Sequence, residues 1–411
     1  MKVPRQPEVN IGMIGHVDHG KTTLTKTLTG EWTDRHSEEI KRGISIKLGY
    51  ADAAFYKCPR CQGAEAYNNM PKCSTCGGEA ALLRTVSFVD APGHETLMAT
   101  MLSGAAMMNG ALLLIAANEK CPQPQTKEHL MALTISGVEK IVIVQNKIDI
   151  VDEARARENY AEIKAFTKGT IAENSPIVPV CAHQEANIDV LIEAIEMHIP
   201  TQAIEHGKPA RMFVARSFDI NPPGKKLDEL VGGVLGGTLL SGKLKIGDEI
   251  EIAPGRRVED KGKIRLEPVV TEITSLFSGG TQMDEIRPGG LIAIGTLLDP
   301  YLTKSDSMIG KVVGRPGTLP PVLSKLSMDI KLLERVVGYA KDIAVEALKS
   351  SEPLMLSVGT TNTVGMVTSA RGESADVALK IPVCAEKGQR VAISRKIAGK
   401  WRLIGYGILS E

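Results

Sequence analysis

The sequence has few aromatic residues and no long apolar run. Only 4% of its 411 residues are aromatic, whereas it holds 40 glycines and 22 prolines, so we expect many tight turns and cores of small aliphatic side chains. This composition argues against an all-helical protein. The longest apolar run, residues 111–117, is too short to span a bilayer, and no apolar segment follows the charged amino terminus. We therefore expect a cytoplasmic chain with no membrane partner.

The chain also has almost no net charge, because 49 Lys plus Arg oppose 48 Asp plus Glu. This balance excludes a disordered polyelectrolyte and, taken as an average, argues against a nucleic-acid binder. The average conceals an asymmetry. Residues 1–206 hold 20 basic against 25 acidic side chains, whereas residues 207–411 hold 29 against 23. A basic carboxyl-terminal half therefore keeps nucleic-acid binding open.

Strand and helix patterns alternate in the first half of the chain. Short apolar runs predict buried strands at residues 9–14, 86–89, 112–116, 141–144 and 177–180. One helical pattern follows the capping residue Asp152, and its apolar side chains share a face: Ala156, Tyr160, Ile163 and Phe166. A second ends before Pro200 and has the stripe Ile188, Leu191, Ile192 and Ile195. This alternation predicts an α/β domain with a doubly wound, mostly parallel sheet.

After Pro200 the pattern changes to short alternating runs separated by Gly and Pro. Residues 232–252 are typical of strands joined by tight turns, and a second break at 315–321 precedes another alternating run at 328–332. We therefore expect two all-β barrel domains after the first domain. The predicted division is 1–206, 207–325 and 326–411.

Residues 15–22 fit the P-loop pattern G-x-x-x-x-G-K-[ST], between a predicted strand and a predicted helix. Glycines allow backbone N–H groups to approach phosphate oxygens, and the helix amino terminus adds partial positive charge. Lys21 can reach the β- and γ-phosphates, and the Thr22 hydroxyl can bind Mg²⁺. An accidental glycine-rich turn is the alternative, which this context disfavours.

Two further motifs follow predicted strands in the order expected behind a P-loop. Asp90 and Gly93 form D-x-x-G, in which the carboxylate can serve the Mg²⁺ shell and the glycine N–H can contact a γ-phosphate. Residues 146–149 read Asn-Lys-Ile-Asp. The carboxylate of Asp149 can accept hydrogen bonds from guanine N1–H and N2–H₂, a pair that adenine does not offer. D-x-x-G alone is a weak signal, and residues 146–149 alone could be an exposed charged loop. The order of the two motifs behind the P-loop disfavours that alternative.

Four of the seven cysteines lie close together, with the spacing Cys58-x₂-Cys61-x₁₁-Cys73-x₂-Cys76. An odd cysteine count with this clustering favours a metal in a reducing compartment over disulfides. Four sulfur ligands leave no open position, so we predict a structural zinc knuckle over residues 56–80. Redox dithiols or reduced surface thiols are the alternatives.

The three nucleotide motifs in this order resemble the GTP-binding domain of translational GTPases, and the β-domains fit the elongation-factor layout over essentially the whole chain. The resemblance narrows to the gamma-subunit family of archaeal translation initiation factor 2 through four segments: residues 42–49, the cysteine insertion, 121–130 and 401–407. It implies a P-loop GTPase that uses GTP or GDP, Mg²⁺ and Zn²⁺.

The resemblance also implies roles for individual residues. His94 is expected to position the attacking water. The expected nucleotide-binding residues are Asp18, His19, Gly20, Lys21, Thr22, Thr23, Asp90, Gly93, Asn146, Lys147, Asp149, Cys181, Ala182 and His183. The expected Mg²⁺ shell is Thr22, Asp18, Gly43, Ser45 and Asp90. Ser45 stands where the family usually has threonine, and Cys181 where it usually has serine. Because the loop that contains Cys181 acts through backbone N–H groups, we expect nucleotide binding to survive the second difference.

The function implied by the resemblance is GTP-dependent delivery of initiator methionyl-tRNA to the small ribosomal subunit, in a complex with alpha and beta subunits. Residues 387–410 contain no acidic side chain but six basic ones: Lys387, Arg390, Arg395, Lys396, Lys400 and Arg402. Their charge fits a phosphate-binding surface and a solvated face equally well, and the resemblance favours tRNA contact. The alternatives are an elongation-type carrier of other aminoacyl-tRNAs, an assembly scaffold that binds GTP without hydrolysing it, and a GTPase that regulates a metabolic enzyme.

Overall fold

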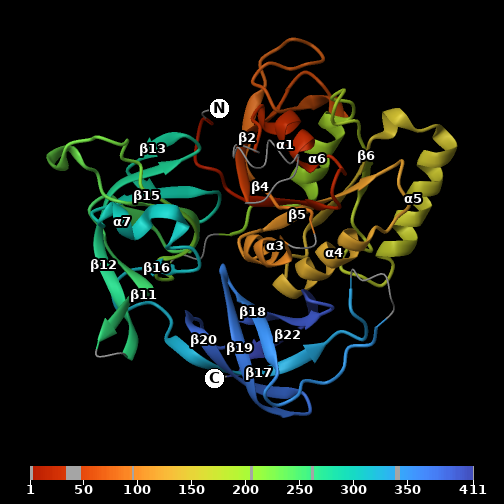
Figure 1. Ribbon diagram of the computed structural model, residues 1–411. Helices are drawn as coiled ribbons and strands as arrows, with labels where there is room; N and C mark the ends of the chain where they lie inside the picture. Colours follow the sequence, from red (N-terminus) through yellow and green to blue (C-terminus); the bar gives the residue numbers. More distant parts are fainter. Residues whose placement is uncertain are drawn as a thin grey trace. The chain divides into compact units, whose positions relative to one another are not determined.

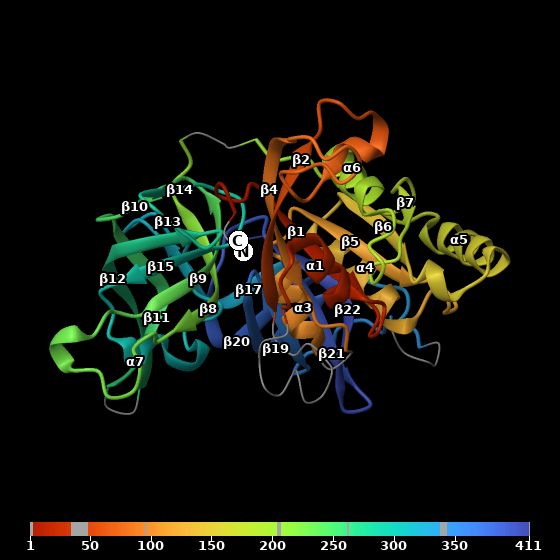
Figure 2. The same cartoon turned by 90° about the horizontal axis from the view of Figure 1, so that it is seen from above.

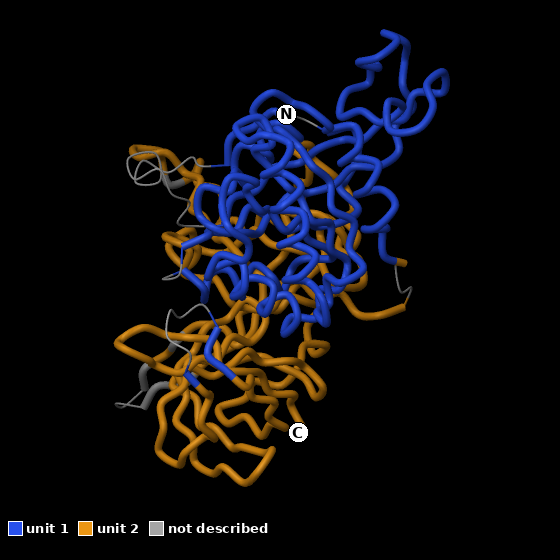
Figure 3. The backbone as a smooth tube through the Cα atoms, turned by 90° about the vertical axis from the view of Figure 1, so that its right-hand side faces the viewer, with its two compact units in different colours: residues 1–202, 335–343 blue, residues 203–334, 344–411 orange. Residues whose placement is uncertain are grey.

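The computed structural model describes residues 3–33, 48–94, 97–203, 207–260, 263–337 and 343–410. Figure 1 labels the helices and strands of the chain. The chain forms two compact units, which Figure 3 distinguishes by colour. Unit 1 contains residues 1–202 and 335–343, and unit 2 contains residues 203–334 and 344–411. No helix in the described ranges is long and apolar enough to cross a membrane.

Unit 1 is built on a seven-stranded sheet with the order β3-β2-β4-β1-β5-β6-β7. Its strands are β1 Asn10–Gly15, β2 Gly49–Lys57, β3 Tyr67–Asn68, β4 Ala81–Asp90, β5 Gly110–Ala116, β6 Ile141–Asn146 and β7 Ile177–Pro179. Every residue of β1, β5 and β6 is buried, because helices cover both faces of a parallel sheet. The five predicted strands are thus confirmed, whereas β2 and β3, which pair antiparallel at one edge, were not predicted.

The described helices of unit 1 are α1 Lys21–Thr29, α3 Met98–Ala105, α4 Pro124–Ser136, α5 Glu153–Thr167 and α6 Ile188–His198 (Figure 2). The predicted stripe of α6 is buried and packs with α1 in one hydrophobic core. Asp152 caps α5 by accepting a 2.8 Å hydrogen bond from the Arg155 backbone N–H. The predicted apolar face of α5 is partly wrong, because Tyr160 is exposed and Asn159 is buried beside Ile163.

Unit 2 contains two β-barrels, which confirms the predicted fold class. The first has the strand order β11-β16-β8-β9-β15-β12-β13 and closes through β11 and β12. Its elements are β8 Arg211–Phe218, β9 Val234–Ser241, β10 Leu244–Lys245, β11 Glu249–Asp260, β12 Lys263–Ser278, β13 Thr281–Met283, β14 Glu285–Ile286, β15 Ile292–Thr296, α7 Pro300–Thr303 and β16 Val312–Gly314. Glycine is required where strands cross closely: a Cβ at Gly237 would lie 1.8 Å from the Phe213 carbonyl oxygen.

The second barrel is closed in the order β17-β20-β19-β18-β21-β22. Its strands are β17 Val322–Leu332, β18 Pro353–Val358, β19 Thr361–Arg371, β20 Ser374–Cys384, β21 Arg390–Ile397 and β22 Lys400–Leu409. β17 begins at Val322, ahead of the domain boundary expected at residue 325. The barrels meet in a small apolar cluster of Ala253, Val312 and Cys384, so Cys384 is a packing thiol.

Candidate nucleotide site and metal centre

The P-loop connects β1 to α1 through a turn that needs glycine at both ends. Gly15 has φ +143° and Gly20 has φ +88°, a region that other residues rarely adopt. A Cβ at Gly15 would lie 2.4 Å from the Leu114 carbonyl oxygen, so the chain could not take this path with a larger residue. The turn places the amino terminus of α1, whose first backbone N–H groups have no acceptor within the helix, at the carboxyl edge of the sheet.

Lys21 brings the P-loop and the loop after β4 together. Its Nζ donates to the carbonyl oxygens of Gly15, at 3.0 Å, and His16, at 2.7 Å. A Cβ at Gly93 would lie 2.5 Å from the same Nζ. The ammonium group therefore lies where the two predicted phosphate-contacting segments meet, and Gly93 leaves room for it because it has no side chain.

Asp90 and Thr22 lie in contact, as expected of two groups that serve one Mg²⁺ ion. Asp90 Oδ2 accepts hydrogen bonds from Thr22 Oγ1, at 2.9 Å, and from Thr33 Oγ1, at 2.6 Å. Carboxylate and hydroxyl oxygens are the ligands that Mg²⁺ prefers, so this donor set fits that ion. Asp18 is exposed in the P-loop with φ 62°. The remaining predicted ligands, Gly43 and Ser45, lie outside the described residues.

Three segments converge at the side-chain amide of Asn146. Its Nδ2 donates to the His19 carbonyl oxygen at 2.9 Å, and its Oδ1 accepts from the Ala182 backbone N–H at 3.1 Å. Because an amide is both donor and acceptor, Asn146 can hold the P-loop and the loop of residues 181–183 at once. Asp149 is exposed after this strand end, where a ligand could reach its carboxylate.

The other predicted nucleotide-binding residues differ in their exposure. Burial raises the pKa of the Cys181 thiol, and the nearby Asp149 carboxylate raises it further, so Cys181 is a neutral packing group. Thr23 is half-buried on α1, Lys147 is half-buried with φ 64°, and His183 is exposed. His94 is half-buried in the loop after β4, and its carbonyl accepts a 2.9 Å hydrogen bond from the Leu97 N–H.

Two residues behind the P-loop were not predicted as part of the site. His129 Nδ1 accepts a 3.0 Å hydrogen bond from the Gly15 backbone N–H. Glu119 lies 3.4 Å from Nε2 of His19, whose Nδ1 is 2.9 Å from the Leu114 carbonyl oxygen. Burial lowers the pKa of His129 to about 3 and that of His19 to about 4, so both rings are neutral near pH 7. Only the segment 121–130, noted for its resemblance, could have indicated His129.

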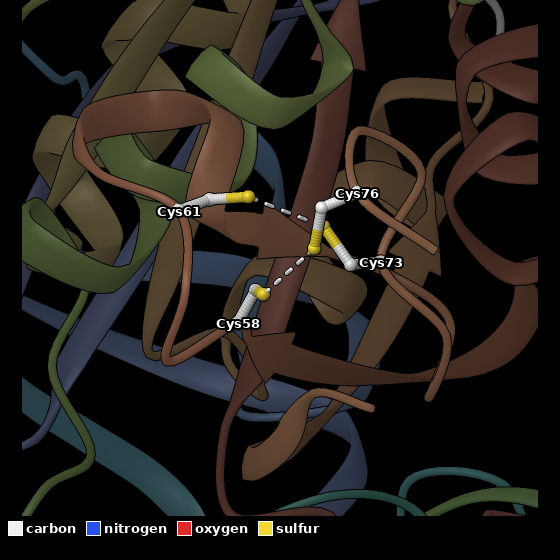
Figure 4. Close-up of side chains that lie close together, drawn as sticks. All are labelled: Cys58, Cys61, Cys73 and Cys76. Carbon is white, nitrogen blue, oxygen red and sulfur yellow. Dashed lines mark hydrogen bonds between the residues drawn. The ribbon is translucent and has the colours of Figure 1, made fainter. Parts of the chain in front are cut away.

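The four cysteine sulfurs lie within 4.8 Å of one another (Figure 4). Cys58 and Cys76 are 3.5 Å apart, and Cys61 and Cys73 are 3.7 Å apart. Four sulfurs at about 2.3 Å from a tetrahedral zinc ion are about 3.7 Å from each other, so this arrangement fits one such ion. Backbone hydrogen bonds from Arg60 and from Cys76 lower the pKa of Cys58 and of Cys73, the latter to about 6, whereas burial raises the pKa of Cys61 to about 12. The thiolate, which is the form that binds metal, is therefore favoured at Cys58 and Cys73.

The basic residues of segment 387–410 divide into two groups. Arg395 donates to the Glu352 carboxylate and, at 2.9 Å, to the Glu346 carbonyl oxygen, so it holds the barrel together. Arg402 is also buried. The other four are exposed: Lys387, Arg390, Lys396 and Lys400. Only this second group offers charge to an external polyanion.

Three family models match successive parts of the chain. "Elongation factor Tu GTP binding domain" matches residues 6–201, and "Elongation factor Tu domain 2" matches residues 232–314. "Initiation factor eIF2 gamma, C terminal" matches residues 324–409. The first match contains the P-loop, the loop after β4, the Asn146 segment and the cysteine cluster, and the other two fall on the two barrels.

Curated relatives match over nearly the full length. "Translation initiation factor 2 subunit gamma" of Methanothermobacter thermautotrophicus is 62% identical over 404 residues, which is 98% of this chain and 99% of the relative. The protein with the same description in Methanocaldococcus jannaschii is 60% identical over 408 residues, 99% of this chain and 98% of the relative.

Two solved structures share the fold. Bacterial selenocysteine-specific elongation factor EF-Sec has a TM-score of 0.75 and 25% sequence identity. The match covers 98% of this chain and 58% of the EF-Sec chain. Elongation factor SelB from Methanococcus maripaludis, solved with the GTP analogue GPPNHP, has a TM-score of 0.73 and 22% identity, covering 100% of this chain and 80% of that one. A mixed-sheet domain followed by two barrels is thus a fold shared with these elongation factors.

Proposed function

Because the chain belongs to the gamma-subunit family of translation initiation factor 2, we propose that it binds initiator methionyl-tRNA in its GTP state and delivers it to the small ribosomal subunit. It is a GTPase with an elongation-factor-type GTP-binding domain, which implies GTP or GDP and Mg²⁺. The observation that supports the proposal is that the P-loop, the segment 146–149 and the loop of residues 181–183 meet at the side chain of Asn146.

The proposed roles at the phosphate end follow from the contacts described above. Lys21 and the N–H groups of residues 18–23 hold the phosphates, at the positive end of α1. Thr22 and Asp90 hold the metal, with Asp18, Gly43 and Ser45 completing its shell. Bound Mg²⁺ supplies positive charge against the phosphate oxygens. His94 orients the attacking water from the loop after β4, a role suited to a half-buried imidazole.

The proposed guanine site consists of residues 146–149 and 181–183. Asp149 accepts from the guanine edge, while Asn146 fixes the loop whose backbone N–H groups close over the base. A site that reads two donors rejects a base lacking them by on the order of 10⁴-fold. Cys181 is expected to act through its backbone, because its thiol is neutral and buried.

The switch that we propose depends on Gly93. Its N–H contacts the γ-phosphate while its missing side chain admits Lys21, so loss of that phosphate releases both the loop after β4 and the segment of residues 43–45. The barrels then change their affinity for tRNA. Exposed basic residues at 387–400 are the proposed tRNA contacts, because phosphate backbones are bound mainly through Lys and Arg.

The remaining elements of the proposal concern organisation. We infer a heterotrimer with alpha and beta subunits, a cytoplasmic location and no membrane partner. We infer three domains, with the second boundary moved from residue 325 to the segment 315–321, because β17 already begins at Val322. The cysteine cluster holds a structural zinc ion, since four sulfurs leave no position for a substrate.

The proposal is tested by tRNA affinity under two nucleotide states. The full chain, with the other two subunits, is titrated with initiator methionyl-tRNA in the presence of a non-hydrolysable GTP analogue or GDP. Binding should be much tighter with the analogue, whereas equal binding would overturn the switch. Lys387→Ala serves as a graded control, because removal of one exposed charge should weaken binding in both states without changing their ratio.

An elongation-type carrier is the second candidate, and the fold shared with two elongation factors favours it. Competition between initiator and elongator tRNAs separates the two functions: preference for the initiator supports the initiation factor. A scaffold that does not hydrolyse GTP is separated by turnover with ribosomes, which it would lack. A regulator of a metabolic enzyme would bind neither tRNA.

A further inference from the structure

The carboxyl end of α1 is capped by a side chain from the cysteine insertion. The last four carbonyl groups of a helix have no partner within it. In α1 the Lys26 carbonyl accepts from the Gly30 N–H at 2.6 Å. The next two carbonyls, of Thr27 and Leu28, both accept from Nδ2 of Asn69, at 3.0 and 3.3 Å. A single amide from another segment thus fixes the last turn of the helix that begins at Lys21.

Asn69 stands directly beside the segment that the cysteines organise. It follows β3, which has only two residues and pairs with the end of β2. The preceding Asn68 is buried and accepts from Ser74, through both its N–H at 3.0 Å and its hydroxyl at 2.9 Å. Ser74 lies between Cys73 and Cys76. The position of Asn69 is therefore tied to the loop that carries two of the four sulfurs.

The last turn of α1 in turn contacts the guanine end of the nucleotide site. Thr27 Oγ1 donates to the Ala182 carbonyl oxygen at 2.8 Å. The N–H of the same Ala182 bonds Asn146, whose amide holds the P-loop carbonyl of His19. A continuous path of hydrogen bonds thus joins the cysteine loop, α1, the guanine loop and the P-loop.

We propose that Asn69 is a positioning residue through which the metal state of the four-cysteine cluster sets the affinity for guanine nucleotide. The inference rests on the proposed nucleotide site. A two-residue strand cannot hold a loop in place by itself, whereas metal binding supplies the free energy that orders small cysteine-rich segments. Without the metal, the loop of Ser74 is released, Asn69 leaves the α1 carbonyls, and the last turn of α1 no longer supports Ala182.

Linkage makes the effect reciprocal. If the metal raises nucleotide affinity by some factor, nucleotide raises metal affinity by the same factor. The two hydrogen bonds of Asn69 suggest a factor of about three to ten. A contiguous path alone does not establish coupling, so the decisive measurement is the change in this factor when Asn69 is altered.

The experiment uses the full chain loaded with zinc. Zinc affinity is measured by competition with a chelator, with and without saturating GDP, and GDP affinity is measured on zinc-loaded and zinc-stripped protein. In the wild type each ligand should tighten the other about three- to tenfold. Asn69→Ala removes the amide, and the isosteric Asn69→Asp has no side-chain N–H donor. In both variants the effect of GDP on zinc affinity and the effect of zinc on GDP affinity should fall to a factor of one, while the four cysteines still bind zinc.

Met70→Ala is the matched control, because Met70 is the exposed neighbour of Asn69; it should couple like the wild type. The proposal is overturned if wild-type zinc affinity is the same with and without GDP, or if Asn69→Ala keeps the wild-type factor. Because the zinc-free chain is the end state of the chelator competition, the comparison between wild type and Asn69→Ala separates coupling through Asn69 from unfolding on zinc removal. If the zinc-loaded wild type binds no GDP, the proposed function fails instead.

Discussion

The backbone N–H of Gly15 donates a 3.0 Å hydrogen bond to Nδ1 of His129. The ring of His129 is fully buried on α4, so the first residue of the P-loop is held from behind by a helix that follows β5. The Gly15 carbonyl is held from the other direction by Lys21. Both polar backbone groups of this glycine are therefore fixed by side chains, which orients the turn that receives the phosphates.

Replacing His129 should weaken nucleotide binding although the residue does not reach the nucleotide. In His129→Ala the Gly15 N–H loses its acceptor in a buried position, which costs about 1–3 kcal/mol, and part of this cost should appear in GDP affinity. Equilibrium titration with a fluorescent GDP analogue measures the change. His198→Ala, at an exposed histidine on α6, should bind as the wild type does. Unchanged affinity in a folded His129→Ala would contradict the role.

His129 should also make unfolding depend on acid pH. Its pKa is about 3 in the folded chain and about 6.5 when exposed, so between these values the unfolded chain binds a proton that the folded chain does not. The free energy of unfolding should therefore fall as the pH drops below 6.5, by up to about 1.4 kcal/mol per pH unit for this group. Above about pH 6.5 the contribution of His129 to the free energy of unfolding should not change with pH. Urea titrations of wild type and His129→Gln at pH 5 and pH 7.5 measure the slope, which should be smaller in the variant.

The sequence predicted the elements of unit 1 that are buried on both faces. The apolar runs of β1, β5 and β6 have no solvent-facing side, so they stand out as uninterrupted hydrophobic segments. β2 was missed because its Gly49–Lys57 sequence mixes small and polar residues at an edge. On α5 the predicted buried face wrongly included Tyr160 in place of Asn159. Apolar periodicity cannot reveal a buried polar residue such as Asn159, whose side chain forms hydrogen bonds with Gln145 and with the Glu119 carbonyl.

The site shows the same limit. Lys21, Asp90 and Asn146 belong to motifs whose spacing carries their chemistry, so they could be nominated without coordinates. His129 and Asn69 act through backbone groups far away in sequence, and no local pattern marks such a partner. For the basic segment, the sequence showed the number of charges but not which of them are exposed. A charge count does not separate Arg395, which pairs with Glu352, from the exposed Lys396.

His94→Ala should lower the rate of GTP hydrolysis while leaving nucleotide binding nearly unchanged. A side chain that orients or deprotonates water contributes about 10²- to 10⁴-fold to such a rate, and His94 belongs to no binding loop of the guanine. Single-turnover phosphate release in the presence of small ribosomal subunits measures the rate, and titration with a GTP analogue measures binding. Wild-type turnover by this variant would remove His94 from the mechanism.

Asp149→Asn should change base preference from guanine to xanthine. The carboxylate accepts two donors of guanine, whereas an amide can donate to the 2-oxo group of xanthine, so the ratio of GDP to XDP affinities should fall by about 10²-fold or more. Competition titrations with the two diphosphates measure the ratio. Cys181→Ser is the control and should keep guanine preference, because the adjoining loop is held through the Ala182 N–H. A guanine-selective Asp149→Asn would place base recognition elsewhere.

The basic segment offers a test that separates tRNA contact from barrel stability. Lys396 and Lys400 are exposed near the turn between β21 and β22, so Lys396→Ala with Lys400→Ala should reduce initiator-tRNA affinity and lower the slope of log affinity against log salt by about 1 to 2, with thermal stability unchanged. Arg395→Ala should instead lower stability and leave the salt dependence unchanged. This variant breaks the ion pair with Glu352, which is mostly buried, so the melting temperature of the protein should fall while the slope of log affinity against log salt stays the same. If the double lysine variant bound tRNA with the wild-type slope, the phosphate contacts would have to lie outside this turn.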